Sequence, residues 1–300
     1  MGRTVPGSGL PDRLRDNGGM LAIVFALASA ISYGGSDFAA GLAARSVSVI
    51  QVTLVASAAA LLAVAAAMPF AAAHPPAAAA LAWGAAAGLG GTLGAFALYF
   101  GFRHAAFSVA GPLSAVGTAG FSVLAGLLLG ERPTALALAG IILALPAIVG
   151  VSASAAQEHT RSFAGVAAGL VAGACFALLL VGLDQAGSGS GLWPVAAAQV
   201  AELVVALAVA AVTGNLRWPG TRAGGLAAVT GATGAAGTIL YFLATHQGLL
   251  AVTAVLTSLY PAVTIVLARI VLGERLTRLR LAGLALAAGC VALIAAGGAG

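Results

Sequence analysis

The chain has 300 residues, of which 61% are hydrophobic and only 7% are charged, and its mean hydropathy is +1.08. Soluble domains carry about 25% charged residues, so this composition excludes an ordinary soluble fold and predicts a membrane protein. The net charge of +5 comes from 13 arginines without any lysine, which excludes an ATP-binding P-loop because that motif requires lysine. No basic cluster is interleaved with aromatic residues, so we expect no nucleic-acid partner.

Residues 1–19 are polar and include Pro6, Gly7, Arg13 and Asp16, and we expect this tail to be disordered. The apolar run Met20–Ala43 follows it. A basic start before an apolar run is typical of a signal peptide, but this run is too long for one and further apolar runs follow. We therefore predict a retained first transmembrane helix.

Nine more apolar runs follow along the chain. Each is close to the roughly 20 residues that a helix needs to cross the hydrocarbon layer. A β-barrel would show short alternating segments, whereas these runs are continuously apolar. We therefore predict an all-α polytopic membrane protein with about ten transmembrane helices. The nine runs are roughly Val49–Phe70, Ala80–Phe102, Ser108–Leu129, Leu136–Val151, Phe163–Leu183, Leu192–Val212, Gly224–Thr245, Leu249–Leu272 and Leu281–Ala296.

Small residues within these runs favour close packing between helices. Gly84 and Gly88, and likewise Gly90 and Gly94, have the spacing of small residues at helix–helix contacts. The two cysteines, Cys175 and Cys290, both lie within apolar runs and form no metal-like pair. We expect them to be small core residues, and we expect no disulfide framework, no metal site and no cofactor.

The chain repeats itself at an offset of 143 residues. Leu129-Gly130-Glu131-Arg132 returns as Leu272-Gly273-Glu274-Arg275. The glycines at 88, 91 and 94 match those at 231, 234 and 237, and Tyr33 falls opposite Phe176. These matches predict two repeats, residues 20–153 and 154–300, each of about five helices. An odd helix number inverts the second repeat in the membrane, which is the architecture of many secondary transporters.

Two halves that each end the fourth helix in Leu-Gly-Glu-Arg resemble the EamA family of the drug/metabolite transporter superfamily. The resemblance implies ten helices around a central cavity lined by the first, third and fourth helices of each half. It also implies export of amino acids or other small metabolites. The family usually has a proline thirteen residues before the motif Glu. The second half has Pro261 at that position, whereas the first half has Thr118, with Pro112 earlier in the same helix.

The repeated motif itself has a structural interpretation. Gly130 and Gly273 can end a helix, because glycine adopts the left-handed conformation there. Glu131 and Glu274 would then favour the positive start of the helix that follows. We expect these residues to shape the loops and not to bind substrate.

Polar residues within the spans are the candidates for function, because a charge at mid-bilayer costs about 2.5–3.5 kcal/mol on insertion scales. The candidate substrate-cavity residues are Tyr33, Ser36, Asp37, Tyr99, Ser114, Thr118, Phe176, Tyr241, Ser258 and Tyr260. Alternatively, the tyrosines are interfacial, the hydroxyls pack between helices, and Asp37 is a helix-end carboxylate that meets water or Arg45. We expect no catalytic residue.

Glu202 lies near the middle of the predicted seventh span, with Gln199 one turn earlier on the same face. One interpretation makes Glu202 a proton-coupling or ligand-binding acid. The other interpretation makes it a neutral partner that hydrogen-bonds Gln199 between helices. Both remain open at the level of the sequence.

These observations predict a secondary transporter in the cytoplasmic membrane, exporting a small metabolite by alternating access. Its expected partners are the substrate, the lipid bilayer and protons, and it would act as a monomer or homodimer. A membrane scaffold or sensor, an ion channel and an intramembrane enzyme are the alternatives, although no channel filter or catalytic motif is present. Orientation stays open, since the arginine count favours external termini whereas the family resemblance implies cytoplasmic ones.

Overall fold

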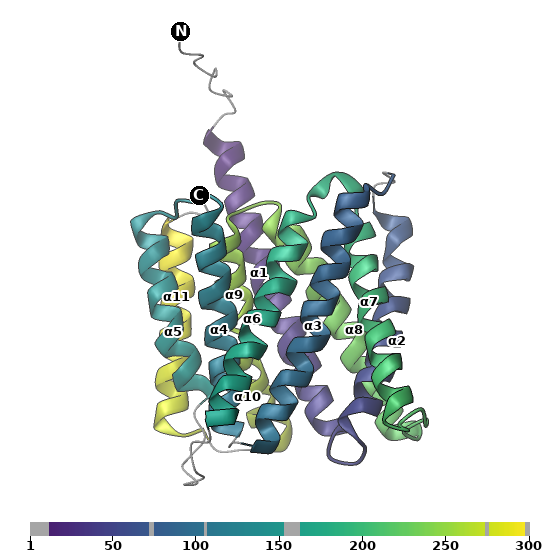
Figure 1. Cartoon of the computed structure of the whole chain (residues 1–300). Coiled ribbons are helices and arrows are strands. Elements are labelled where there is room, and N and C mark those ends of the chain that lie inside the picture. The colour runs from purple at the N-terminus through teal and green to yellow at the C-terminus, as the bar shows by residue number, and fades with distance from the viewer. Residues whose placement is uncertain (1–11, 72–74, 105–106, 153–162, 274–275, 298–300) are drawn as a thin grey trace.

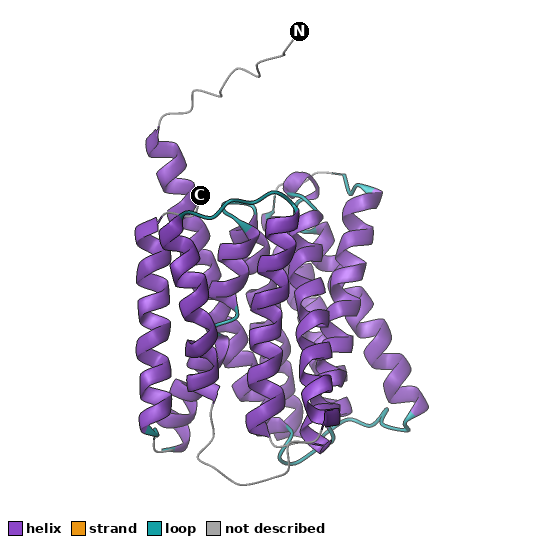
Figure 2. Cartoon of the chain, turned by 60° about the vertical axis from the view of Figure 1, so that its left-hand side comes forward, coloured by secondary structure: helices purple, strands orange, loops and turns teal. Residues whose placement is uncertain are grey.

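The computed structural model describes residues 12–71, 75–104, 107–152, 163–273 and 276–297, and within them all regular structure is helical (Figure 2). The helices of the first half are α1 (Asp12–Ala43), α2 (Val49–Ala67), η1 (Met68–Phe70), α3 (Ala78–His104), α4 (Phe107–Leu128) and α5 (Ala135–Ser152). Those of the second half are α6 (Phe163–Gln185), η2 (Ser188–Ser190), α7 (Trp193–Val212), α8 (Thr221–Thr245), α9 (Leu250–Thr257), α10 (Tyr260–Leu272) and α11 (Arg278–Gly297).

The chain is a multi-pass membrane protein. Within the described residues, eight segments are long and apolar enough to cross a bilayer, and two shorter apolar helices cover Leu113–Leu128 and Ala135–Gly150. Large apolar side chains lie on the outside of the bundle, where Leu62, Ile142 and Val204 are all more than half exposed. Such a surface is unfavourable in water and favourable in lipid. The polytopic all-α class predicted from composition is therefore confirmed.

The helices run roughly parallel to one axis and form a single bundle (Figure 1). The chain enters α1 and leaves α11 at the same end, which we call the terminal end. From there α1 runs toward the opposite end, whereas α6, its counterpart in the second half, runs toward the terminal end. The two halves are thus traversed in opposite directions.

Helices from the two halves pack against each other in matching pairs. α1 packs on α8 and α3 packs on α6, so the first helix of each half contacts the third helix of the other. In the same way α2 packs on α8, α3 packs on α7, and α5 packs on α11. This exchange is what two copies of one unit produce when an approximate two-fold axis relates them, and it supports the repeat deduced from the sequence.

Glycines allow the backbones of these pairs to approach closely. Gly84 and Gly88 of α3 lie directly against the backbone of Pro194 and Ala198 in α7. Gly231 of α8, the repeat counterpart of Gly88, lies directly against the backbone of Ala56 in α2. A side chain at any of these glycines would collide with backbone, so the predicted small-residue packing is observed.

The repeated motif ends helices as predicted. Gly273 adopts a left-handed conformation with φ of 70° at the C-cap of α10, and Gly130 has φ of 93° after α4. The partner predicted for Glu131 is wrong, however. Its carboxylate accepts backbone hydrogen bonds from Leu250 and Ala251 at the start of α9, not from the following helix α5. The start of α9 is closer in space, although it is distant in sequence.

Two predicted boundaries differ from the structure. α1 begins at Asp12, so residues 12–19 are helical and are not the disordered tail expected there. The predicted span Leu249–Leu272 is two helices, α9 and α10, which are separated at Ser258 and Leu259. Pro261 explains the second difference, because it has no N–H to continue the helical hydrogen-bond ladder. Glu274 lies outside the described residues.

Candidate functional site

Two adjoining compartments lie between the helices, each with a volume of about 200 Å³. The first compartment is bounded by α1, α3, α4, α6, α9 and α10, so both halves of the chain contribute to it. The second is bounded by α1, α2, α3, α6, α7 and α8. Both are lined by Tyr33, Asp37, Ala95, Phe176 and Leu179. We refer to the two compartments together as the cavity.

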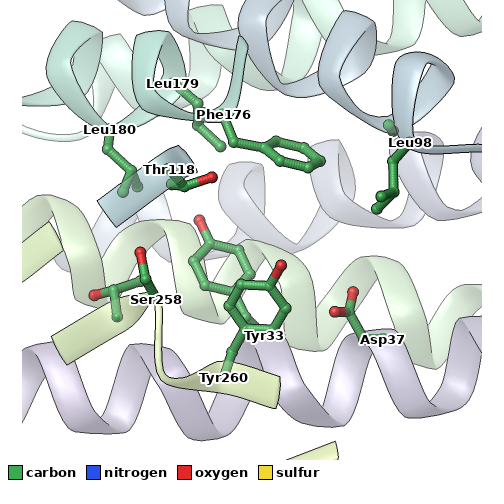
Figure 3. Close-up of a pocket in the computed structure, with 11 residues that line it drawn as sticks. Tyr33, Asp37, Leu98, Thr118, Phe176, Leu179, Leu180, Ser258 and Tyr260 are labelled. Atoms are coloured by element: carbon green, nitrogen blue, oxygen red, sulfur yellow. The ribbon is translucent and has the colours of Figure 1, made fainter. Parts of the chain in front are cut away.

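The first compartment has one polar and one apolar wall (Figure 3). Tyr33 and Asp37 of α1 lie beside Tyr260, which starts α10, and Ser258 precedes that helix in the break after α9. Across from them lie apolar side chains from α3 and α6, namely Leu98, Phe176, Leu179 and Leu180. Thr118 of α4 also lines this compartment. The arrangement suits a small amphipathic solute.

The aromatic side chains of the cavity are positioned by glycines of the opposite half. A β-carbon at Gly237 of α8 would lie 2.9 Å from the Tyr33 ring, and one at Gly94 of α3 would lie 2.7 Å from the Phe176 ring. These two contacts are repeat counterparts, because Phe176 lies 143 positions after Tyr33 and Gly237 lies 143 positions after Gly94. The hydroxyl groups of Tyr33 and Thr238 are hydrogen-bonded at 3.0 Å, which further fixes the Tyr33 ring.

The second compartment is the more polar of the two. Glu202 and Gln199 reach it from α7, and Ser36 and Asp37 reach it from α1. A β-carbon at Gly91 of α3 would lie 2.7 Å from the Glu202 carboxylate, so this glycine leaves room for the acid. The Gln199 side chain is 2% exposed, and its Oε1 has no hydrogen-bond partner. Buried amide oxygens normally have a partner, so this one is an unsatisfied acceptor next to the second compartment.

Nine of the residues predicted from the sequence line the cavity. Tyr33, Asp37, Thr118, Phe176, Ser258 and Tyr260 line the first compartment, and Ser36, Gln199 and Glu202 line the second. Their roles in transport stay predictions, but their meeting around one space makes a common role possible.

Two of the predicted residues are placed differently, and the side chain of a third lies outside the described part of the chain. Tyr241 is fully buried outside both compartments, and its hydroxyl donates to the Leu180 carbonyl at 3.2 Å. Ser114 is buried without a hydrogen-bond partner for its hydroxyl, and its carbonyl oxygen lies close to Gly173 of α6. Both therefore pack between helices. Tyr99 belongs to α3, but its side chain lies outside the described part of the chain.

The alternative interpretations of the two acids find no support. No hydrogen bond joins Glu202 to Gln199 within the described residues, although both side chains reach the same compartment. Asp37 likewise makes no ion pair with Arg45 in that part of the chain, and it lines the cavity instead. Both acids therefore remain candidates for contact with a solute or a proton.

Several cavity residues were missed at the level of the sequence. They are the hydroxyl residues Thr53, Ser57, Thr92, Thr230 and Thr238. Thr230 and Thr238 bracket Gly234 at four-residue intervals on one face of α8, and Thr92 follows Gly91, the repeat counterpart of Gly234. Hydroxyl residues at helical spacing beside the repeated glycines were the signal that could have identified them.

The residues described contain no group of histidine, cysteine, aspartate or glutamate side chains that could hold a metal ion. The site therefore consists of carboxylates, an amide, hydroxyls and aromatic rings. Chemically, such a set can bind and release a solute, and its two carboxyl groups can take up or give off protons.

Comparisons with known proteins agree with this architecture. No curated protein matches the chain, whereas 17 chains of solved structures do. One of these, a crystal structure, is 19% identical with a TM-score of 0.69, covering 93% of this chain and 95% of that chain. At that identity the likeness shows the fold alone. Residues 20–153 match the EamA-like transporter family, the family that the repeated Leu-Gly-Glu-Arg motif indicated. The match to the EamA-like transporter family thus covers residues 20–153, the first of the two predicted repeats.

Proposed function

We propose that the protein is a secondary transporter that exports a small metabolite across the cytoplasmic membrane by alternating access. The observation that carries this proposal is the cavity, which has polar groups within a helix bundle and is lined by both halves of the chain. A buried polar space in an apolar bundle is costly unless a solute or water uses it. A scaffold would have no need for such a space.

The arrangement of the helices supports the alternating-access mechanism. The first and third helices of each half exchange contacts with the other half, and these same four helices, α1, α3, α6 and α8, line the cavity. Two inverted five-helix repeats can rock against each other around such a site, opening it first to one side and then to the other. The break between α9 and α10 next to the cavity is a natural hinge for this motion.

Glu202 is the residue that we propose couples transport to protons. It lies in the second compartment, and no positively charged side chain lines that compartment among the described residues. A carboxyl group there can bind a proton when the cavity faces one side and release it when the cavity faces the other. Asp37 borders both compartments and can transmit the state of the solute site to this proton site.

The test is counterflow into proteoliposomes that contain the purified protein and a panel of radiolabelled amino acids and monoamines. The proposal expects saturable accumulation of at least one compound without chemical change. Thr118→Trp, which fills the first compartment, should abolish this accumulation. Leu62→Trp is the matched control, because Leu62 is 72% exposed on the lipid side. Conversion of a compound without its movement would favour an intramembrane enzyme, and neither outcome would favour a scaffold or sensor.

A further inference from the structure

Most polar groups of the second compartment offer a ligand hydrogen-bond acceptors, and two of them are carboxyl groups. The hydroxyl protons of Ser36, Thr92, Thr230 and Thr238 are used, because these groups donate to the carbonyl oxygens of Thr230, Gly88, Leu226 and Gly234. What remains are the lone pairs of these hydroxyls, the carboxylates of Asp37 and Glu202, and the groups of Thr53, Ser57 and Gln199, which can donate as well as accept. An ionised carboxylate only accepts, so a ligand that satisfies the two acids must bring donors.

The charge of the lining also has one sign. Both compartments, as far as their described residues go, contain two carboxyl groups and neither arginine nor histidine. An isolated carboxylate in a low-dielectric interior is strongly unfavourable unless a cation accompanies it. A positively charged ligand compensates this cost, whereas an anion increases it.

The lining also disfavours a zwitterion, because a carboxylate on the ligand would find no positively charged side chain among the described lining residues and only neutral donors, on Thr53, Ser57, Gln199 and Tyr260. The break between α9 and α10 is the one place in the first compartment where helix-end N–H groups could serve. There the N–H groups of Leu259 and Ala262 already donate to the carbonyl oxygens of Leu256 and Leu259. Pro261 between them has no N–H. These three positions of the break therefore offer no free N–H group to an anion.

The first compartment determines the size and the polarity of the uncharged part of the ligand. Its wall of Leu98, Phe176, Leu179 and Leu180 is apolar, and Tyr33 and Tyr260 place aromatic rings beside Asp37 (Figure 3). Apolar cavities of about 150 Å³ accept a benzene ring, so a compartment of about 200 Å³ has room for one ring with a short arm. Aromatic faces next to a carboxylate also stabilise an ammonium group through cation–π attraction.

We infer that the cavity binds a small organic cation, with its ammonium group at Asp37 facing the acceptors of the second compartment and its apolar body against Phe176 and Leu179. The inference rests on the proposed carrier function and names the chemical class of its substrate. Glu202, deeper in the second compartment, is then available for the exchanged proton.

The test compares four probes that share a phenyl ring and differ in charge: 2-phenylethylamine, 2-phenylethanol, 3-phenylpropionate and phenylalanine. Binding to the purified full chain in detergent is measured by isothermal titration calorimetry at neutral pH. We expect the amine to bind at least about tenfold more tightly than the other three, since only the amine gives the buried carboxylate a counter-charge without adding an anion, and an uncompensated buried charge costs more than one such factor. Equal or tighter binding of the anion or the zwitterion, or no binding of the amine, would overturn the inference.

A pair of matched variants tests whether Asp37 is the carboxylate that binds the ammonium group. Asp37→Asn keeps the shape of a side chain that makes no described hydrogen bond, and it should weaken binding of the amine at least about tenfold. Asp184→Asn is the control, because Asp184 lies at the end of α6 outside the cavity, hydrogen-bonded to Thr245 and Gln185. It should leave the affinity within about twofold. Equal effects of the two variants would also overturn the inference.

Transport distinguishes failure of this inference from failure of the carrier proposal. Counterflow of an anionic or zwitterionic compound, together with absent amine binding, would retain the carrier and reject the cation class. Asp37-dependent binding of the amine without movement of any compound would retain the cation site and reject the carrier.

Discussion

Glu131 and Ala251 join the two halves of the chain, since the Glu131 carboxylate accepts a 2.9 Å hydrogen bond from the Ala251 backbone N–H. The same carboxylate also accepts from the N–H of Leu250. These N–H groups belong to the first turn of α9, where a helix has unpaired donors and a partial positive charge. The acid of the first Leu-Gly-Glu-Arg motif therefore caps a helix that leads to the cavity from the other half.

Removal of this cap should destabilise the protein. Glu131→Ala leaves two backbone donors without their partner, which we expect to cost about 0.5–2 kcal/mol, as for other N-caps. The melting temperature of the purified protein should fall accordingly. Arg132→Ala is the neighbouring control at an exposed position and should change it little. Equal melting temperatures for the two variants would show that the cap contributes nothing to stability.

The protonation of Glu131 should affect stability with a defined sign. Partial burial raises the pKa of Glu131 above its ordinary value and outweighs the two backbone N–H groups, which lower it. The folded state therefore holds this proton to a higher pH than the unfolded chain does. The protonated Glu131 therefore stabilises the folded state below the ordinary pKa of 4.5, and this stabilisation is lost as the pH rises through the raised pKa. Relative to Glu131→Gln, the parent protein should lose melting temperature as the pH rises above the ordinary pKa of the group; a difference that stays constant with pH would contradict this.

The glycines at the contacts between the halves should not tolerate a side chain. Gly231→Ala would place a β-carbon against the backbone of Ala56, and overpacking of this kind costs about 1–3 kcal/mol. Gly225→Ala on the same helix is the matched control, because no atom lies within 4 Å of the position of its β-carbon. We expect lower melting temperature and yield for the first variant only. Similar values for both would mean that α2 can move away from α8 without loss.

Tyr260 and Tyr241 should respond differently to truncation. Tyr260 lines the cavity, so Tyr260→Ala should reduce transport while the melting temperature changes little. Tyr241 is 0% exposed and hydrogen-bonded to Leu180, so Tyr241→Ala should cost about 3–5 kcal/mol through the space that it leaves. Transport and thermal unfolding of both variants provide the measurement. The assignment fails if Tyr260→Ala transports as the parent does.

Glu202→Gln tests proton coupling. Glutamine keeps the size and the hydrogen-bonding capacity of the side chain but cannot titrate. Proteoliposomes with this variant should still bind substrate, and their transport should no longer depend on pH. A pH profile identical to that of the parent protein would instead exclude Glu202 as the coupling group.

Sequence alone predicted the apolar membrane-spanning segments and indicated the repeat. A bilayer requires about 20 apolar residues in each helix, and this requirement is local, so it can be read along the chain. The ends of α4 and α10 were predictable for a similar reason, because Gly130 and Gly273 adopt a conformation that glycine favours. The break before α10 was not predicted, although Pro261, which cannot donate a helical hydrogen bond, accounts for it.

Only the tertiary structure decided which polar residues meet. In a soluble helix, alternation of polar and apolar residues distinguishes the inner face from the outer one. Here lipid and protein interior are both apolar, so the sequence could not separate Tyr260, which faces the cavity, from Tyr241, which packs between helices. The meeting of Asp37 with Glu202, and of Glu131 with the start of α9, depends on how the two halves exchange their helices. That exchange arises from packing between segments far apart in the chain, which no local pattern encodes.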